Sequence, residues 1–98
     1  MNHLPWLVDF GAAWCGACKE LDKQTFSDKS VGEEASRFVA LKVDATNDED
    51  PVVVSTIKQL NVIGLPTVIV FDARGKEVKR FTDFVPPSTM LEALRLAH

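Results

Sequence analysis

The chain has 98 residues, of which 46 % are hydrophobic and 26 % are charged, and its formal net charge is −3 at pH 7. This length suits one small domain and is too short for two, and the composition is that of an ordinary globular domain. The acidic balance gives no electrostatic reason to expect nucleic acid as a partner. No apolar run approaches the roughly 18–20 residues that a membrane span requires, so no membrane insertion is predicted for this segment.

The start of the chain lacks the basic stretch and the cleavage pattern of a signal peptide. Strand-like sequence begins by about Trp6, with almost no lead-in. We therefore expect residues 1–98 to form a single domain that belongs to a longer protein. The chain holds two cysteines, three positions apart, whereas a secreted disulfide scaffold carries more cysteines at wider spacings.

Apolar and β-branched runs predict four strands. A turn between the last two of them makes an antiparallel hairpin. The strands are expected at Trp6–Phe10, Phe38–Asp44, Thr67–Phe71 and Glu77–Phe81.

Helical composition predicts four helices between and after these strands. Pro51 suits the first turn of the third helix, and Ser88 is expected to cap the last one. The helices are expected at 16 to about 25, 31–35, 51 to about 60, and 87 to about 97.

The order of these elements predicts an α/β fold. The first two strands are joined through helical sequence and should be parallel, with a right-handed crossover. The hairpin adds antiparallel strands, so the sequence predicts a mixed four-stranded sheet with helices on both faces.

The segment Cys15-Gly16-Ala17-Cys18 carries the clearest chemical signal. Cys15 stands where a loop enters a helix, where unpaired N–H groups and the helix dipole stabilise a thiolate. Cys18 follows about one turn later on the same side. This spacing predicts an exposed attacking thiolate and a shielded resolving thiol, which together exchange disulfides.

Two other interpretations compete with a redox pair. Half of a zinc site is one, but zinc requires four ligands and His3 and His98 stand at opposite ends of the chain. An inert structural disulfide is the other, although so small a loop constrains the unfolded chain little.

The motif Trp14 to Lys19, followed by Gly64-Leu65-Pro66-Thr67, resembles the thioredoxin superfamily. Within it, Ala17 to Glu20 and Thr25 to Asp28 are similar to the C-terminal thioredoxin-like domain of the DsbD family of transmembrane thiol:disulfide interchange proteins. Two further stretches, Asp44–Asp48 and Leu60–Thr67, resemble the same domain. The resemblance covers nearly the whole chain from Trp6, and it implies a thioredoxin-like fold.

The resemblance implies roles for further residues, beginning with Pro66 and Asp9. Pro66 is expected to be cis and to face the cysteines, with an ordinary trans proline as the alternative. Asp9 matches the buried acid beneath the resolving cysteine. Burial should raise its pKa and let it accept the Cys18 proton; the alternative is an acid that faces solvent.

Asp22 matches a second acid that would keep the cysteines protonated until a partner docks, or it is simply a solvated helix residue. Lys42 is a looser match to the lysine that often accompanies the buried acid. Trp14, Gly16, Ala17 and the Leu65 backbone are expected to contact the substrate chain.

No phosphate loop, nucleotide fingerprint or haem-attachment motif is present in the sequence. The cysteine pair carries electrons itself, so we expect no bound cofactor. The uncharged Gly16-Ala17 dipeptide favours a reductant over an oxidant.

The resemblance implies a relay domain in the periplasm, part of an inner-membrane protein, and a monomer is the default expectation. It would receive electrons from a transmembrane dithiol and pass them to a periplasmic acceptor domain. The alternatives are a free, general thioredoxin-type protein-disulfide reductase, which would be cytoplasmic, and a non-catalytic binding module.

Overall fold

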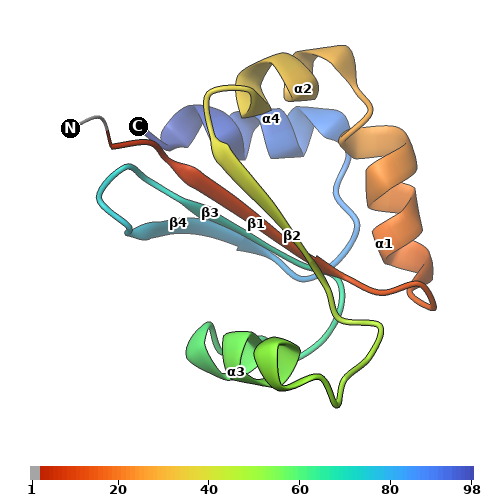
Figure 1. Ribbon diagram of the computed structural model, residues 1–98. Helices are drawn as coiled ribbons and strands as arrows, with labels where there is room; N and C mark the ends of the chain where they lie inside the picture. The colour runs from red at the N-terminus through yellow and green to blue at the C-terminus, as the bar shows by residue number, and fades with distance from the viewer. Residues whose placement is uncertain (1–2) are drawn as a thin grey trace.

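The computed structural model describes residues 3–98 (Figure 1); Met1 and Asn2, the start of the expected domain, lie outside them. Within this range no helix is long and apolar enough to cross a membrane. The elements are β1 (Trp6–Gly11), α1 (Gly16–Glu20), the π-helical segment η1 (Leu21–Thr25), α2 (Lys29–Ala35), β2 (Val39–Asp44), α3 (Pro51–Gln59), β3 (Thr67–Phe71), β4 (Glu77–Phe81) and α4 (Pro87–Leu96).

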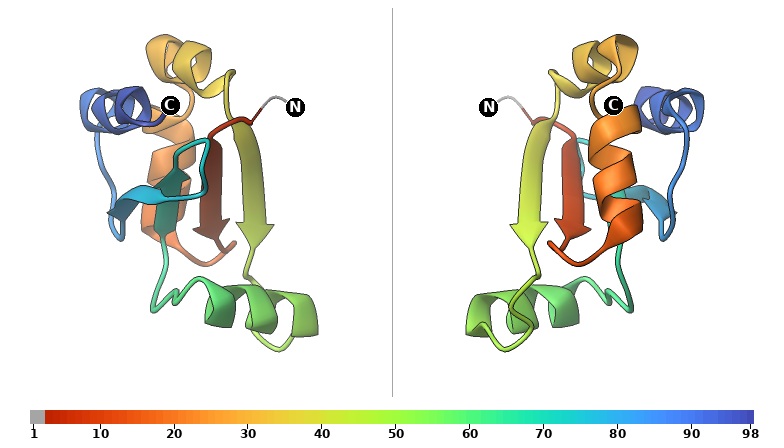
Figure 2. Two further views of the ribbon diagram at one scale, coloured as in Figure 1. Left: turned by 90° about the vertical axis from the view of Figure 1, so that its left-hand side faces the viewer. Right: turned by 90° about the vertical axis from the view of Figure 1, so that its right-hand side faces the viewer.

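The four strands form one sheet in the order β2-β1-β3-β4. Strand β1 runs parallel to β2 and antiparallel to β3, and β3 and β4 are antiparallel. Helices α1, α2 and α4 cover one face, and α3 lies against the other (Figures 1 and 2). The mixed sheet between two helical layers confirms the predicted fold class, including the thioredoxin-like arrangement.

Each sheet face has its own apolar core. On the α1 side, the cluster is built around Leu7, Val68, Val70 and residues of α4. On the α3 side, Val8, Phe10 and Ile69 are buried against residues of and after α3. The alternation along β1 therefore places Leu7 and Asp9 on one face and Val8 and Phe10 on the other.

The expected helix after the cysteines changes its hydrogen bonding at Leu21. Residues 21–25 are π-helical, and the Phe26 N–H donates to the Leu21 carbonyl oxygen at 2.8 Å. The widened turn places Leu21 and Thr25 in the core, both almost fully buried. The Thr25 hydroxyl donates to the Val85 carbonyl at 2.5 Å, which ties this segment to the chain before α4.

The expected Ser88 cap of α4 is wrong. The N-cap residue is Pro86, which makes no side-chain capping bond, and the helix begins at Pro87. Proline has the helical φ value and lacks the N–H that would otherwise need a partner, so it starts the helix without a capping hydroxyl.

Two leucines of α4 provide a matched test of this packing. Leu94 is fully buried, whereas Leu96 is 61 % exposed. We expect Leu94→Ala to lower the free energy of unfolding by about 2–5 kcal/mol, because it removes buried methyl groups and leaves a cavity. Leu96→Ala should change it by less than about 0.5 kcal/mol. Urea unfolding of both variants measures the difference, and equal losses would contradict the assignment of the core.

Candidate active site

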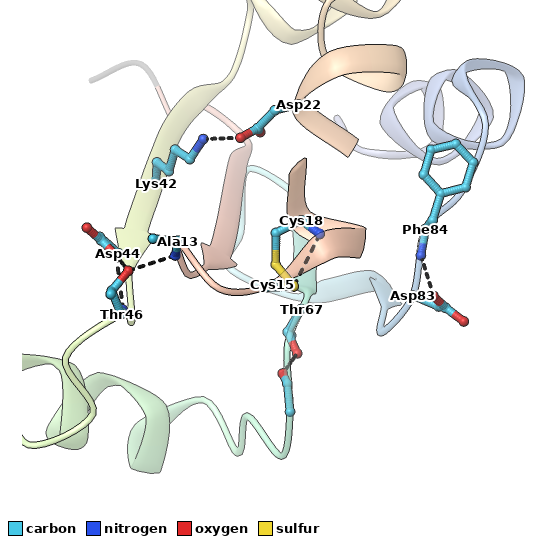
Figure 3. Close-up of a disulfide and its surroundings, with 11 residues drawn as sticks. Ala13, Cys15, Cys18, Asp22, Lys42, Asp44, Thr46, Thr67, Asp83 and Phe84 are labelled. Atoms are coloured by element: carbon cyan, nitrogen blue, oxygen red, sulfur yellow. Dashed lines mark hydrogen bonds and ion pairs between the residues drawn. A yellow bond between two sulfur atoms is a disulfide. The ribbon is translucent and has the colours of Figure 1, made fainter. Parts of the chain in front are cut away.

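A disulfide joins Cys15 and Cys18 at the point where the loop after β1 becomes α1 (Figure 3). Cys15 is the N-cap residue, with an extended backbone. The Cys18 N–H donates to Cys15 Sγ at 3.2 Å. The sequence expectation that Cys15 stands at the beginning of a helix is confirmed, and an N–H donor is directed at its sulfur.

Both cysteines are buried in the disulfide form, with 6 % exposure for Cys15 and 7 % for Cys18. The expectation of an exposed Cys15 is therefore wrong for this form. The two residues pack with Ala12, and Ala17 and Leu65 pack against them. These apolar neighbours cover most of the pair in the disulfide form.

The loop before β3 lies against the cysteine pair through Leu65. The Leu65–Pro66 peptide bond is cis, as the family resemblance implied. The buried Thr67 hydroxyl donates to the Gly64 carbonyl at 2.6 Å, across this bond. Thr67 thereby holds the loop in the shape that brings Leu65 to Cys15 and Cys18.

A polar cavity of about 440 Å³ lies on the other side of the cysteine pair. Asp9, Cys18, Asp22 and Lys42 all contribute to its lining. Gly11 also lines it, and its backbone approaches Cys18 so closely that a Cβ built there would lie 3.6 Å from Sγ. The structure thus brings Asp9 and Asp22 into one space with Cys18.

The charges in this cavity perturb one another. Burial raises the pKa of Asp9 to about 6, the negative charge of Asp22 adds to this rise, and Lys42 opposes it. Lys42 Nζ donates to Asp22 Oδ2 at 2.6 Å, and this bond raises the Lys42 pKa. Asp9 is therefore an acid whose pKa lies close to neutral pH.

Sequence reasoning missed a polar clamp on the loop that carries Cys15. The Ala13 N–H donates to Thr46 Oγ1 at 2.9 Å, and the Thr46 hydroxyl donates to Asp44 Oδ1 (Figure 3). The Ala45 N–H donates to the Gly11 carbonyl at 2.7 Å. The available signal was Asp44 at the end of a predicted strand with Thr46 two residues later, because such residues bond locally where a strand passes into a turn.

The remaining expected substrate contacts lie on the outer side. Trp14 is 67 % exposed, Gly16 is exposed and Ala17 is half-buried. Ile63, which sequence reasoning did not single out, is fully exposed two residues before Leu65. Among residues 3–98, no three His, Cys, Asp or Glu side chains gather in an arrangement that could hold a metal ion.

The raised Asp9 pKa predicts a pH-dependent cost of folding. Between pH 3.8 and about 6 the folded state keeps a proton that the unfolded chain has released, so stability falls as pH rises. We expect Asp9→Asn to be more stable than the parent above pH 6, by about 1–3 kcal/mol, and the difference to shrink towards zero at about pH 4.

Urea unfolding of the disulfide form at both pH values measures this difference. Asp72→Asn is the control, because N–H donation by Lys76 and Arg74 lowers the Asp72 pKa. The change in stability caused by Asp72→Asn should have the opposite sign, since a depressed pKa stabilises the fold at neutral pH and this contribution is lost on acidification. Equal stability of Asp9→Asn and the parent at both pH values would contradict the burial cost assigned to Asp9.

Comparisons with known proteins agree with this geometry. The family model of thioredoxin-like domains matches residues 1–98. The thiol:disulfide interchange protein DsbD of Yersinia enterocolitica is 42 % identical over 93 residues, which are 93 % of this chain and 16 % of that protein. DsbD of Escherichia coli is 42 % identical over 94 residues, with the same two shares. The chain thus spans about one sixth of the length of these relatives.

Solved structures show the same fold. The oxidised C-terminal domain of Neisseria meningitidis DsbD superposes with a TM-score of 0.82 at 25 % identity, over 97 % of this chain and 81 % of that one. A thioredoxin from Thermus thermophilus gives a TM-score of 0.79 at 24 % identity, over 95 % and 72 % of the two chains. With its whole length matched, its cis-proline loop and its cysteine pair at a helix start, the chain belongs to the family of thioredoxin-like domains.

Proposed function

We propose that this domain is a thiol–disulfide oxidoreductase that reduces protein disulfides through Cys15 and Cys18. The observation that carries this proposal is the disulfide itself, placed at a helix start, against Leu65 on one side and a polar cavity on the other. The 42 % identity to proteins named for thiol:disulfide interchange supports it. An inert disulfide would not require the acid-lined cavity behind Cys18.

In the reduced domain, the Cys15 thiolate attacks one sulfur of a partner disulfide, and the other partner sulfur leaves and takes up a proton. The Cys18 N–H that now donates to Cys15 Sγ is positioned to stabilise this thiolate. Cys18 then attacks Cys15 Sγ and releases the second partner sulfur as a thiol. Two electrons pass to the partner, and the domain ends as the Cys15–Cys18 disulfide.

Asp9 is the group that would take the Cys18 proton in the second step. It lines the same cavity as Cys18, so a proton can pass directly or through water. Its pKa of about 6 makes it mostly ionised at neutral pH, yet basic enough to hold a proton. Asp22, from the same cavity, adds negative charge near the thiols, which favours their protonated form before a partner docks.

Trp14, Gly16, Ala17 and Leu65 would form the contact surface for a substrate chain. The first two are exposed and the other two are half-buried beside the disulfide. Pro66, held cis behind Leu65, would keep the Leu65 backbone available for β-like pairing with an extended segment.

The cellular role we propose is an electron relay within a longer membrane protein. The domain would accept electrons from a transmembrane dithiol and deliver them to a periplasmic acceptor domain. Support comes from the DsbD relatives, of which this chain matches only 16 %. A free reductase of many targets is the second candidate, favoured by the likeness to a Thermus thermophilus thioredoxin.

Trapping of the mixed disulfide tests the exchange and identifies partners. We expect Cys18→Ala to stall after the first step, because no thiol remains to attack Cys15, so a stable adduct should accumulate on non-reducing gels. Cys15→Ala is the matched control and should trap little, since the N–H donor that favours a thiolate is directed at Cys15 Sγ and not at Cys18. Equal trapping by both variants would contradict the assigned order of attack. A trapped transmembrane fragment would support the relay, and only diverse soluble proteins would support the free reductase.

The role of Asp9 is tested on the second step alone. With a mixed disulfide formed in advance between Cys15 and glutathione, we expect Asp9→Asn to release glutathione roughly 10–100-fold more slowly at pH 7. The first step, attack by Cys15, should keep its rate. Rapid acid quenching and mass spectrometry follow both steps, and Asp48→Asn, in an exposed loop, serves as the control. An unchanged release rate in Asp9→Asn would remove Asp9 from the mechanism.

A further inference from the structure

The loop between α3 and β3, residues 60–66, carries Leu65 to the cysteine pair (Figure 1). Its end is fixed by the Thr67 hydroxyl, which donates to the Gly64 carbonyl. Its middle faces solvent, because Ile63 and Gly64 are exposed. The course of the Leu65 backbone therefore depends on how the start of this loop is held.

The start of the 60–66 loop is the C-terminal end of α3. Asn61 has a φ of 53°, a left-handed value that asparagine adopts more readily than most residues. The Val62 N–H donates to the Ile57 carbonyl at 3.0 Å, and the Asn61 N–H donates to the Lys58 carbonyl at 3.4 Å. These two bonds form a Schellman motif, which satisfies carbonyls of the last turn. The carbonyls of Leu60 and Asn61 are left for donors from outside the helix.

Arg80 of β4 supplies those donors. Its Nη2 donates to the Leu60 carbonyl at 2.8 Å, and its Nη1 donates to the Asn61 carbonyl at 3.2 Å. Strand register places Arg80 opposite Ile69, which is buried on the α3 face of the sheet, so the guanidinium reaches the end of α3 on that face. The helix dipole also favours a cation at the carbonyl end of a helix.

Glu77 of β4 holds the guanidinium in place. Its two carboxylate oxygens accept hydrogen bonds from Arg80 Nε at 3.0 Å and from Arg80 Nη2 at 2.8 Å. This paired geometry fixes the plane of the guanidinium, and the Arg80 side chain is only 25 % exposed. Glu77 and Arg80 thus form a clamp of four hydrogen bonds at the start of the 60–66 loop.

We propose that Arg80, held by Glu77, is a positioning residue for disulfide exchange: it fixes the start of the 60–66 loop, so that the Leu65 backbone is oriented for an extended partner chain before that partner docks. This inference deepens the proposed function, because it rests on Leu65 as a contact for the substrate chain. Without the clamp, a partner would have to order the loop as it binds, which costs affinity. A small disulfide that makes no contact with the loop would react as before.

Amide hydrogen exchange in the disulfide form tests the physical part of the proposal. We expect Arg80→Gln to accelerate exchange of the Val62 N–H roughly 10-fold or more, because the turn that protects it loses the clamp. The Val70 N–H in β3 should keep its rate. Lys79→Gln is the matched control, since Lys79 is the neighbouring cation of β4 and makes none of the four bonds of the clamp.

Single-turnover exchange with the reduced domain tests the functional part. One probe is a short peptide rich in Val and Thr, residues that favour an extended chain, with its one cysteine joined to thionitrobenzoate. The other is the symmetric disulfide of thionitrobenzoate alone. With both probes, the Cys15 thiolate attacks one sulfur, the S–S bond of the probe breaks, and coloured thionitrobenzoate leaves with the electron pair of that bond.

We expect Arg80→Gln to raise the half-saturating peptide concentration roughly 5–20-fold, with the limiting rate and the rate of the small probe within about twofold of the parent. Arg80→Lys keeps the charge but lacks the planar fork, so it should recover only part of the loss. Glu77→Gln, which removes only the support of the guanidinium, should raise the peptide value by less, and it takes the place of Arg80→Gln if that variant does not fold.

An unchanged half-saturating peptide concentration in the folded variants would overturn the inference and leave the clamp a purely structural role. Equal losses with the peptide and the small probe, or an equal effect of Lys79→Gln, would also overturn it. A parent domain that reacts with neither probe would instead overturn the proposed function, while exchange of the Val62 N–H would still report whether Arg80 holds the loop.

Discussion

The central position of β1 in the sheet is the constraint on which the site depends. With β2 on one side and β3 on the other, β1 has neighbours along both edges, and four of its six residues are buried. Its carboxyl end delivers the chain to Cys15, and its one acidic residue, Asp9, is half-buried and lines the same cavity as Cys18. A strand held this firmly can position a reactive loop and a buried carboxyl at the same time.

Burial of Asp9 works against stability, yet it creates the chemistry. A carboxyl in water has a pKa near 4 and holds no proton at neutral pH. Desolvation raises the Asp9 pKa to about 6, into the range where an acid can both accept and release a proton. The energetic cost of folding a partly buried charge and the proton exchange with Cys18 that we propose would thus have the same origin.

The two sides of the disulfide differ in character, and this division separates two tasks. Ala17 and Leu65 make the outer side apolar, which suits contact with an extended partner chain. The inner side opens on charged groups, which suits proton transfer. Cys15 and Cys18 lie at the boundary, so in the proposed mechanism electrons would leave towards a partner while the proton leaves towards the cavity.

Much of the fold could be predicted because it follows from local patterns. Apolar runs indicated all four strands, and the cysteine spacing indicated the redox pair. The π-helical turn at Leu21 was missed, because it depends on long-range packing of Leu21 and Thr25 in the core. The start of α4 at Pro87 was predicted, but the Ser88 cap was wrong. The cis state of Pro66 came from the family resemblance, since an X–Pro bond is usually trans.

The sequence by itself determined which residues could carry the chemistry: two cysteines at one-turn spacing, an acid inside an apolar strand, and a proline before a strand. Only the tertiary structure decided which of them act on one another. Lys42 is 33 positions from Asp9 along the chain, yet strand register makes them neighbours, and Asp22 reaches the same cavity from the helical layer. Electrostatic interaction depends on distance in space and on the surrounding solvent, and neither can be read from order along the chain.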